Sequence, residues 1–167
     1  MRIIFFGSSH GVPERNRRCS SILFEAGENK YFIDMGTQSI ELLADRNINP
    51  ESINAVFITH MHGDHTNGLV SFLDLSSWYY KSADPQIFLP GNMEKTTSAL
   101  RGWLGANGTK MRDFRFSPVN EGVIFDDGVI KVTAFKTLHT DASFAYLVEG
   151  EGKRVLFGGD MCHKGPC

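Results

Sequence analysis

Cysteine is scarce in this chain of 167 residues. The three cysteines, Cys19, Cys162 and Cys167, are odd in number and form no CxxC pair. This pattern excludes a disulfide framework and makes a reducing cytoplasm the expected location. Long apolar runs are also absent, so no membrane-spanning segment is predicted, and the short hydrophobic stretch at residues 1–7 lacks the layout of a signal peptide.

Net charge is small as well, at −2 with a pI near 6.3. This balance excludes a general attraction to nucleic acid or to an anionic membrane surface. The local exception is Arg15-Asn16-Arg17-Arg18, a basic run that fits either a contact with an anionic substrate or an ordinary solvated loop. Length and a hydrophobic content of 41% predict one domain over residues 1–167 with a sizeable core.

Turn signals divide the chain into predicted strands and helices. Apolar and β-branched runs predict strands at residues 3–6, 21–25, 31–34, 55–59, 86–89, 123–125, 129–135, 145–149 and 154–157. Helical spacing predicts helices at residues 37–46, 68–81 and 92–104, with Thr37 and Asn92 as caps of the first and the third. Turn signals at residues 27–29, 126–128 and 150–153 predict hairpins. Strands, then helices, then strands again indicate an α+β protein with sheets covered by helices.

Half of the six histidines lie in one short stretch, FITHMHGDHTNG at residues 57–68. His60 and His62 are two residues apart and project to the same side of an extended chain. Gly63 permits a sharp turn, after which Asp64 and His65 face the same cavity. Imidazole and carboxylate donors suit Zn²⁺, Mn²⁺ or Fe²⁺, and four of them exceed what one tetrahedral ion needs. A polar turn with Asp64 as a helix cap is the alternative, but it explains one residue of the four.

Two later strands each end in a further donor. His139 follows the predicted strand at residues 129–135, and Asp160 follows Gly158-Gly159 after the strand at residues 154–157. Taken alone, they are typical of a loop histidine and a Gly-Asp turn. Taken with the first cluster, they lie where strands deliver side chains to one edge of a sheet.

This set of motifs, HxHxDH followed by a lone histidine and a Gly-Asp pair, resembles the metallo-β-lactamase superfamily. The resemblance implies a four-layer αβ/βα sandwich and a hydrolase with two divalent metal ions, zinc first and manganese or iron as alternatives. It implies that His60, His62 and His139 hold one ion, while Asp64, His65 and Asp160 serve the other, with Asp160 bridging. A metal-bound hydroxide would be the nucleophile, with Asp64 and His65 also counted as catalytic. Asp34, in an Asp-x-Gly turn, is expected to brace the metal loop and not to bind metal.

The first loop, residues 6–16, is similar to the opening loop of ribonuclease Z and related phosphodiesterases. That similarity implies backbone contacts to a phosphate and makes Ser8, Ser9 and Arg15 candidate substrate-binding residues. His10 replaces a small residue of the pattern and is given no metal-binding role. Residues 70–120 hold no long Gly/Pro-rich arm of the kind that grips transfer RNA in ribonuclease Z. A small phosphodiester or short nucleotide is therefore the expected substrate, with no membrane partner.

The family pattern continues beyond the Gly-Asp motif with further strand and helix and a last histidine ligand. His163 lies only three residues after Asp160, so the fold is expected to be incomplete at its C-terminal end. The chain would be a fragment, or a partner such as a second copy would complete it, or the second metal site would be weak. Two other functions stay open: a hydrolase of a thioester, lactone or β-lactam, and a truncated metal-binding module without catalysis.

Overall fold

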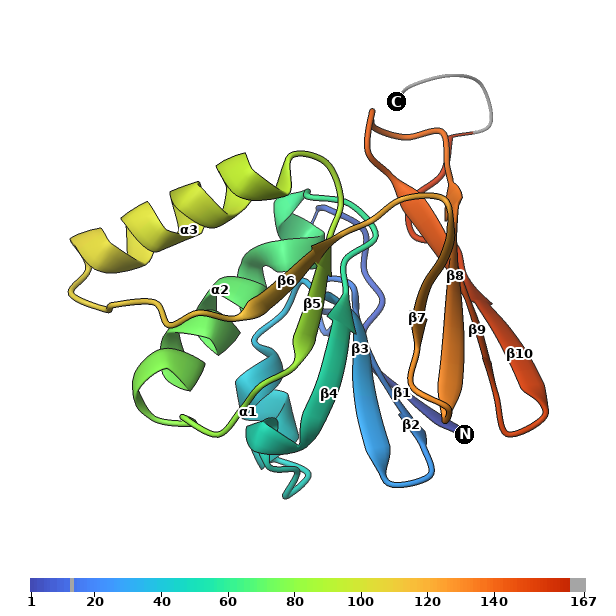
Figure 1. The fold of residues 1–167 in the computed structure, drawn as a ribbon, viewed down its shortest axis with the longest axis horizontal. Coiled ribbons are helices and arrows are strands. Elements are labelled where there is room, and N and C mark those ends of the chain that lie inside the picture. The colour runs from blue at the N-terminus through green and yellow to red at the C-terminus, as the bar shows by residue number, and fades with distance from the viewer. Residues whose placement is uncertain (13, 163–167) are drawn as a thin grey trace.

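Two β-sheets pack face to face in the computed structural model, and helices cover the outer face of the first sheet (Figure 1). The structure describes residues 1–12 and 14–162. The first sheet has the order β1-β2-β3-β4-β5-β6 and the second the order β10-β9-β8-β7. The strands of the first sheet are β1 (Arg2–Gly7), β2 (Ser21–Ala26), β3 (Asn29–Met35), β4 (Ile53–Phe57), β5 (Gln86–Leu89) and β6 (Arg115–Pro118). The strands of the second are β7 (Gly122–Asp126), β8 (Ile130–Lys136), β9 (Phe144–Gly150) and β10 (Lys153–Phe157).

The connections of the first sheet decide where its strands end. Strands β1, β2 and β3 pair antiparallel, whereas β3 to β6 pair parallel. The helices α1 (Ser39–Ala44), α2 (Gly63–Trp78) and α3 (Met93–Ala106), with the short 3₁₀ helix η1 (Pro50–Ser52), lie in the crossovers between the parallel strands. The carboxyl ends of β3, β4 and β5 therefore lie at one edge, and the loops that follow them meet there.

The central strands of the first sheet, β3 to β5, are buried on both faces and are apolar for that reason. In β4 and the residue after it, Val56 and Ile58 pack toward the helices, whereas Ala55 and Phe57 pack toward the second sheet. Such two-sided burial explains the continuous apolar run that the sequence shows before its histidine cluster. The second sheet contributes Tyr146 and other inward side chains to the layer between the sheets.

Helix α2 begins at Gly63, five residues before the predicted start at Gly68. The prediction was wrong because it began at the first apolar residue, whereas the first turn carries the polar side chains Asp64 and His65. The cap predicted at Thr37 is also wrong: α1 starts at Ser39 after Gln38, whose side chain makes no capping hydrogen bond. The cap at Asn92 is confirmed, since its side-chain oxygen accepts from the backbone N–H of Lys95 at 2.9 Å.

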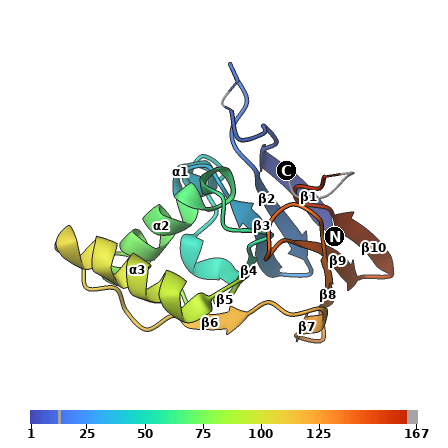
Figure 2. The same cartoon turned by 90° about the horizontal axis from the view of Figure 1, so that it is seen from above.

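Three layers of the expected sandwich are present: one of helices and two of sheet. The helices of the described residues all lie on one side of the first sheet, with the second sheet on the other (Figure 2). Within residues 1–12 and 14–162, no helix covers the outer face of the second sheet, where Val123, Phe135 and Leu156 are exposed. The fourth layer implied by the resemblance is therefore not found in this part of the chain. None of the described helices combines the length and hydropathy that a bilayer crossing needs.

Asp127 joins the two sheets at the edge remote from the histidine cluster. Its carboxylate accepts from the Tyr31 hydroxyl at 2.6 Å and the Asn29 side chain at 3.2 Å, both from the first sheet. It also accepts from the backbone N–H groups of Val129 and Ile130 in its own hairpin, each at 2.9 Å. Partial burial alone would raise the pKa of Asp127, but these hydrogen bonds lower it below its ordinary value.

Replacing Asp127 with asparagine is expected to lower the free energy of unfolding at pH 7 by about 1–2 kcal/mol, because an amide has one acceptor oxygen and no charge. The folded-state pKa lies below the unfolded one, so this contribution is present above the unfolded pKa and is lost as pH falls through the folded pKa. Urea denaturation of both proteins from pH 7 to pH 3 checks this. A difference between them that stays constant with pH would contradict it.

Candidate metal centre

The loop after β4 and the first turn of α2 together carry four of the predicted site residues. Strand β4 ends at Phe57, and the chain then passes through the buried His60 to His62, whose extended backbone is the N-cap of α2. Asp64 and His65 follow in the first turn of this helix. The change from extended to helical backbone within five residues turns all four side chains toward the edge of the two sheets.

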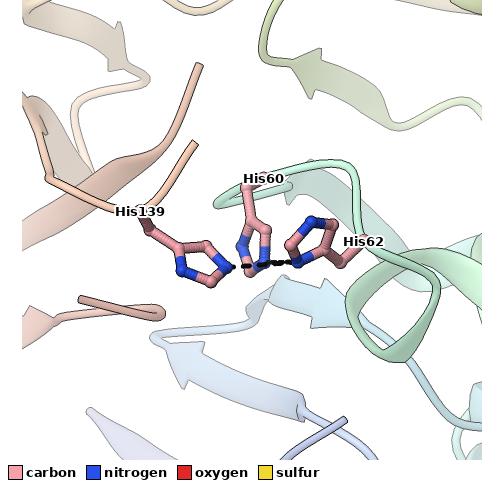
Figure 3. Close-up of side chains that lie close together, drawn as sticks. All are labelled: His60, His62 and His139. Atoms are coloured by element: carbon pink, nitrogen blue, oxygen red, sulfur yellow. Dashed lines mark hydrogen bonds between the residues drawn. The ribbon is translucent and has the colours of Figure 1, made fainter. Parts of the chain in front are cut away.

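His60, His62 and His139 form one candidate ligand group (Figure 3). The Nδ1 atom of His62 lies 3.1 Å from Nε2 of His60 and 3.1 Å from Nε2 of His139. The three ligand atoms all lie within 4.8 Å of one another. His139 comes from the loop between β8 and β9, so the group joins both sheets. Three converging imidazole nitrogens match the protein part of a tetrahedral zinc site that keeps one position open.

His60, His65 and Asp160 form a second candidate group, so His60 belongs to both. Nε2 of His65 lies 3.4 Å from Oδ1 of Asp160 and 3.3 Å from Oδ2 of Asp64. The other oxygen of Asp160 lies 3.8 Å from Nε2 of His139. The Asp160 carboxylate thus lies between His65 and His139, with one oxygen toward each. The structure places Asp64 beside His65, but His60 completes the group.

Asp34 braces this loop, as the sequence predicts. It is fully buried and accepts hydrogen bonds from the backbone N–H of Thr59 at 2.8 Å and from the Thr59 hydroxyl at 2.9 Å. Its Oδ2 atom lies 2.6 Å from Nδ1 of His65. Because Nδ1 of His65 faces Asp34, Nε2 faces Asp64 and Asp160. The sequence pattern did not predict a role for Thr59, although its position directly before the first histidine could have indicated one.

The pKa values of His60 and His65 are shifted in opposite directions. Burial, together with the charge of His65, lowers the pKa of His60 to about 4, so its ring is neutral at pH 7 and keeps a lone pair for a cation. Burial alone would lower the pKa of His65, but the hydrogen bond to Asp34 and the charges of Asp34, Asp64 and Asp160 raise it above its ordinary value. Negative charge is therefore concentrated around His65.

Replacing Asp34 with asparagine is expected to weaken Zn²⁺ binding about 10- to 100-fold while the protein stays folded. An amide nitrogen facing Nδ1 of His65 favours the tautomer that carries its proton on Nε2, which blocks the atom that faces Asp160. Calorimetric titration with Zn²⁺ measures the affinity. Asp84→Asn, on an exposed side chain paired with Arg115, is the matched control and keeps the wild-type affinity. Equal affinities for all three proteins would contradict the orienting role of Asp34.

The first loop lies on the other side of the second group. Ser8, Ser9 and His10 line a cavity of about 440 Å³ together with His65 and Asp160. The Ser9 hydroxyl is buried and has no hydrogen-bond partner among the described residues. Because its hydroxyl lacks a partner there, Ser9 is the residue of this loop whose role at the cavity is most worth testing.

Other residues of the first loop make contacts within the loop and so stabilise its conformation. Arg17 pairs with Glu14 at 2.6 Å and donates to the backbone oxygen of Ser8 at 2.9 Å. Nδ1 of His10 accepts from the backbone N–H of Val12, and Nε2 of His10 lies 3.2 Å from Glu14, so His10 is in neither ligand group. Arg15 is exposed and does not line the cavity. His163 lies outside the described residues.

A larger cavity, of about 910 Å³, lies between α2 and α3. Its lining includes Asn67, Lys95 and the exposed Trp103. None of the predicted metal ligands lines it, so it is separate from the metal centre.

Solved structures share this fold. Human tRNase Z, short form, matches with a TM-score of 0.77 at 22% identity, over 98% of this chain and 70% of that one. The metallo-β-lactamase fold protein YhfI from Bacillus subtilis matches with a TM-score of 0.75 at 18% identity, over 97% of this chain and 63% of that one. At these identities the likeness establishes the fold.

Curated relatives include ribonucleases. Ribonuclease Z of Geobacillus kaustophilus is 32% identical over 152 residues, which cover 89% of this chain and 48% of that protein. Ribonuclease BN of Citrobacter koseri is 32% identical over 160 residues, which cover 92% of this chain and 51% of that protein. The chain thus spans about half the length of the curated relatives it matches.

Two facing sheets with a histidine–aspartate cluster at their common edge give the chain a metallo-β-lactamase fold, and ribonucleases Z and BN are among its curated relatives. Within that fold class, the family model described as "Anti-Pycsar protein Apyc1" matches residues 1–166, and the chain belongs to this family.

Proposed function

We propose that the chain is a metal-dependent hydrolase of phosphodiester bonds, acting on a small phosphodiester or a short nucleotide. The observation that carries this proposal is the position of Asp160, with one carboxylate oxygen toward His65 and the other toward His139. This arrangement suits two divalent ions in adjacent sites, which would supply positive charge to a bound phosphate. The ribonuclease relatives support a phosphodiester as the bond cleaved.

The donor set fits two divalent cations, with zinc as the first choice. The imidazole nitrogens of His60, His62 and His139 converge, and their lone pairs repel one another unless a proton or cation lies between them. Around His65, the carboxylates of Asp64 and Asp160 add negative charge that a second cation would neutralise. Divalent ions bound here would polarise the phosphate and lower the pKa of a coordinated water.

The chain's own residues orient these donors and the substrate. Asp34 holds His65 with Nε2 directed at the acidic pair, and Asp160 spans the two ligand groups. Ser9 offers a buried hydroxyl to a phosphate oxygen in the adjoining cavity. Asp64 is in position to take a proton in the reaction, because its Oδ2 atom lies beside His65 and close to the first loop at Gly11.

Metal content and substrate choice test this function together. Protein purified without chelator is expected to hold close to two ions per chain by plasma mass spectrometry, and to hydrolyse bis(p-nitrophenyl) phosphate faster than nitrocefin. Preference for nitrocefin, a thioester or a lactone would select the other hydrolase function. A metal-loaded chain that hydrolyses none of these would be a binding module, and a chain that binds no zinc or manganese after loading would rule out the metal centre.

Replacing Ser9 with alanine is expected to raise KM for bis(p-nitrophenyl) phosphate about tenfold with little change in kcat, because a hydrogen bond to a charged oxygen contributes about 1.5 kcal/mol. Metal content should not change, since Ser9 is in neither ligand group. Ser98→Ala, on the exposed surface of α3, is the matched control. An unchanged KM in Ser9→Ala would remove Ser9 from the substrate site.

A further inference from the structure

The metal centre is divided between two sheets, so its geometry depends on how the sheets are aligned. His60, His62, Asp64 and His65 belong to the first sheet and its helix, whereas His139 and Asp160 follow strands of the second. Most of the contact between the sheets is apolar and aromatic. Apolar contact is non-directional and tolerates sliding, so directional bonds must set the alignment at the ångström level.

Two hydrogen bonds cross between the sheets directly beside the metal loop. The Tyr146 hydroxyl on β9 donates to the backbone oxygen of Ile58 at 2.5 Å. The backbone N–H of Phe144, on the same strand, donates to the oxygen of Thr59 at 2.9 Å. Both acceptors immediately precede His60, so β9 is fixed to the backbone that carries the first ligand.

The same strand is tied to His139. Ser143 immediately precedes β9 and is buried. Its backbone oxygen accepts from the N–H of Thr137 at 2.9 Å, and its hydroxyl accepts from the N–H of Thr140 at 2.9 Å. These bonds close the short loop on both sides of His139, so a displacement of β9 carries His139 with it.

We infer that Tyr146 is a positioning residue for the metal centre: its hydroxyl aligns β9 with the end of β4 and so sets the separation between His139 and the pair His60 and His62. This inference rests on the proposed metal centre. Tyr146 is fully buried, and its hydroxyl makes one of the two hydrogen bonds described at this edge. Burial, with the charge of Asp34, raises the pKa of Tyr146 well above its ordinary value, so the hydroxyl keeps its proton and remains a donor.

The chain provides a matched control at the opposite edge. Tyr31 is also a fully buried tyrosine between the sheets, and its hydroxyl donates to Asp127 at 2.6 Å. Phenylalanine at either position deletes one oxygen atom and preserves the ring. The two variants therefore lose the same atom and differ in their distance from the metal loop, and thermal denaturation measures the stability that each loses.

The experiment compares wild type, Tyr146→Phe and Tyr31→Phe by calorimetric Zn²⁺ titration, by the visible spectrum of the Co²⁺-loaded protein and by thermal denaturation. Tyr146→Phe is expected to bind Zn²⁺ about tenfold or more weakly and to show a changed Co²⁺ spectrum, whereas Tyr31→Phe binds like wild type. Should Tyr146→Phe be too unstable to titrate at room temperature, all three proteins are compared at about 10–20 °C, where most domains are at their most stable. Wild-type affinity and spectrum in the folded Tyr146 variant would overturn the inference, and a wild type that binds no Zn²⁺ would overturn the metal centre as well.

Discussion

Replacing His60 with alanine is expected to remove metal from both ligand groups at once and to lower phosphodiester hydrolysis at least about a thousandfold, equivalent to roughly 4 kcal/mol. His60 is the histidine that the two groups share, and its neutral, buried ring lies beside those of His62 and His65, at centroid separations of 4.6 and 4.1 Å. A group that loses this donor keeps only two residues. The measurements are metal content per chain and kcat/KM for bis(p-nitrophenyl) phosphate.

His10→Ala is the matched histidine control for metal content. His10 is exposed on the first loop and belongs to neither group, so this variant is expected to hold as many ions as wild type. A His60 variant that retains two ions would show that the ligands are assigned incorrectly. Equal metal loss in both histidine variants would show that unfolding, and not ligation, was being measured.

Gly68→Ala is expected to destabilise the protein by about 3 kcal/mol or more, because helix α2 has no room for a methyl group at this position. A Cβ atom placed there would lie 1.7 Å from the backbone oxygen of Thr37 and 2.7 Å from that of Met35. These are backbone atoms at the end of β3 and in the segment that follows it, and they cannot rotate away. Urea denaturation gives the change in free energy of unfolding.

Gly102→Ala gives the opposite result in the same experiment. Gly102 lies inside α3 on the exposed surface, and a Cβ atom there meets nothing within 4 Å. Alanine is expected to raise stability by about 0.5–1 kcal/mol, since glycine is the poorer helix former. A Gly68 variant as stable as Gly102→Ala would mean that α2 does not pack against residues 35–37 as the structure shows.

Local pattern was sufficient for most strands and for the cap of α3. In β8, Ile130, Val132 and Ala134 face inward, and the sequence shows this alternation as a two-residue period of apolar side chains. The start of α2 was not predicted correctly, because its first turn is polar for reasons of chemistry and not of packing. Asp34 has a left-handed backbone with φ 58°, and its carboxylate faces Thr59 and His65, a combination that the local sequence pattern does not reveal.

The sequence by itself determined the donor types, their order along the chain and the class of ion that they suit. Those properties depend on side-chain chemistry and on short spacings along the chain, and neither depends on how distant segments pack together. Only the tertiary structure decided that His60 belongs to both groups, that Asp160 lies between His65 and His139, and that Tyr146 ties β9 to the metal loop. These relations join residues about 20 to 100 positions apart, and their distances are set by how two sheets stack, which no local pattern encodes.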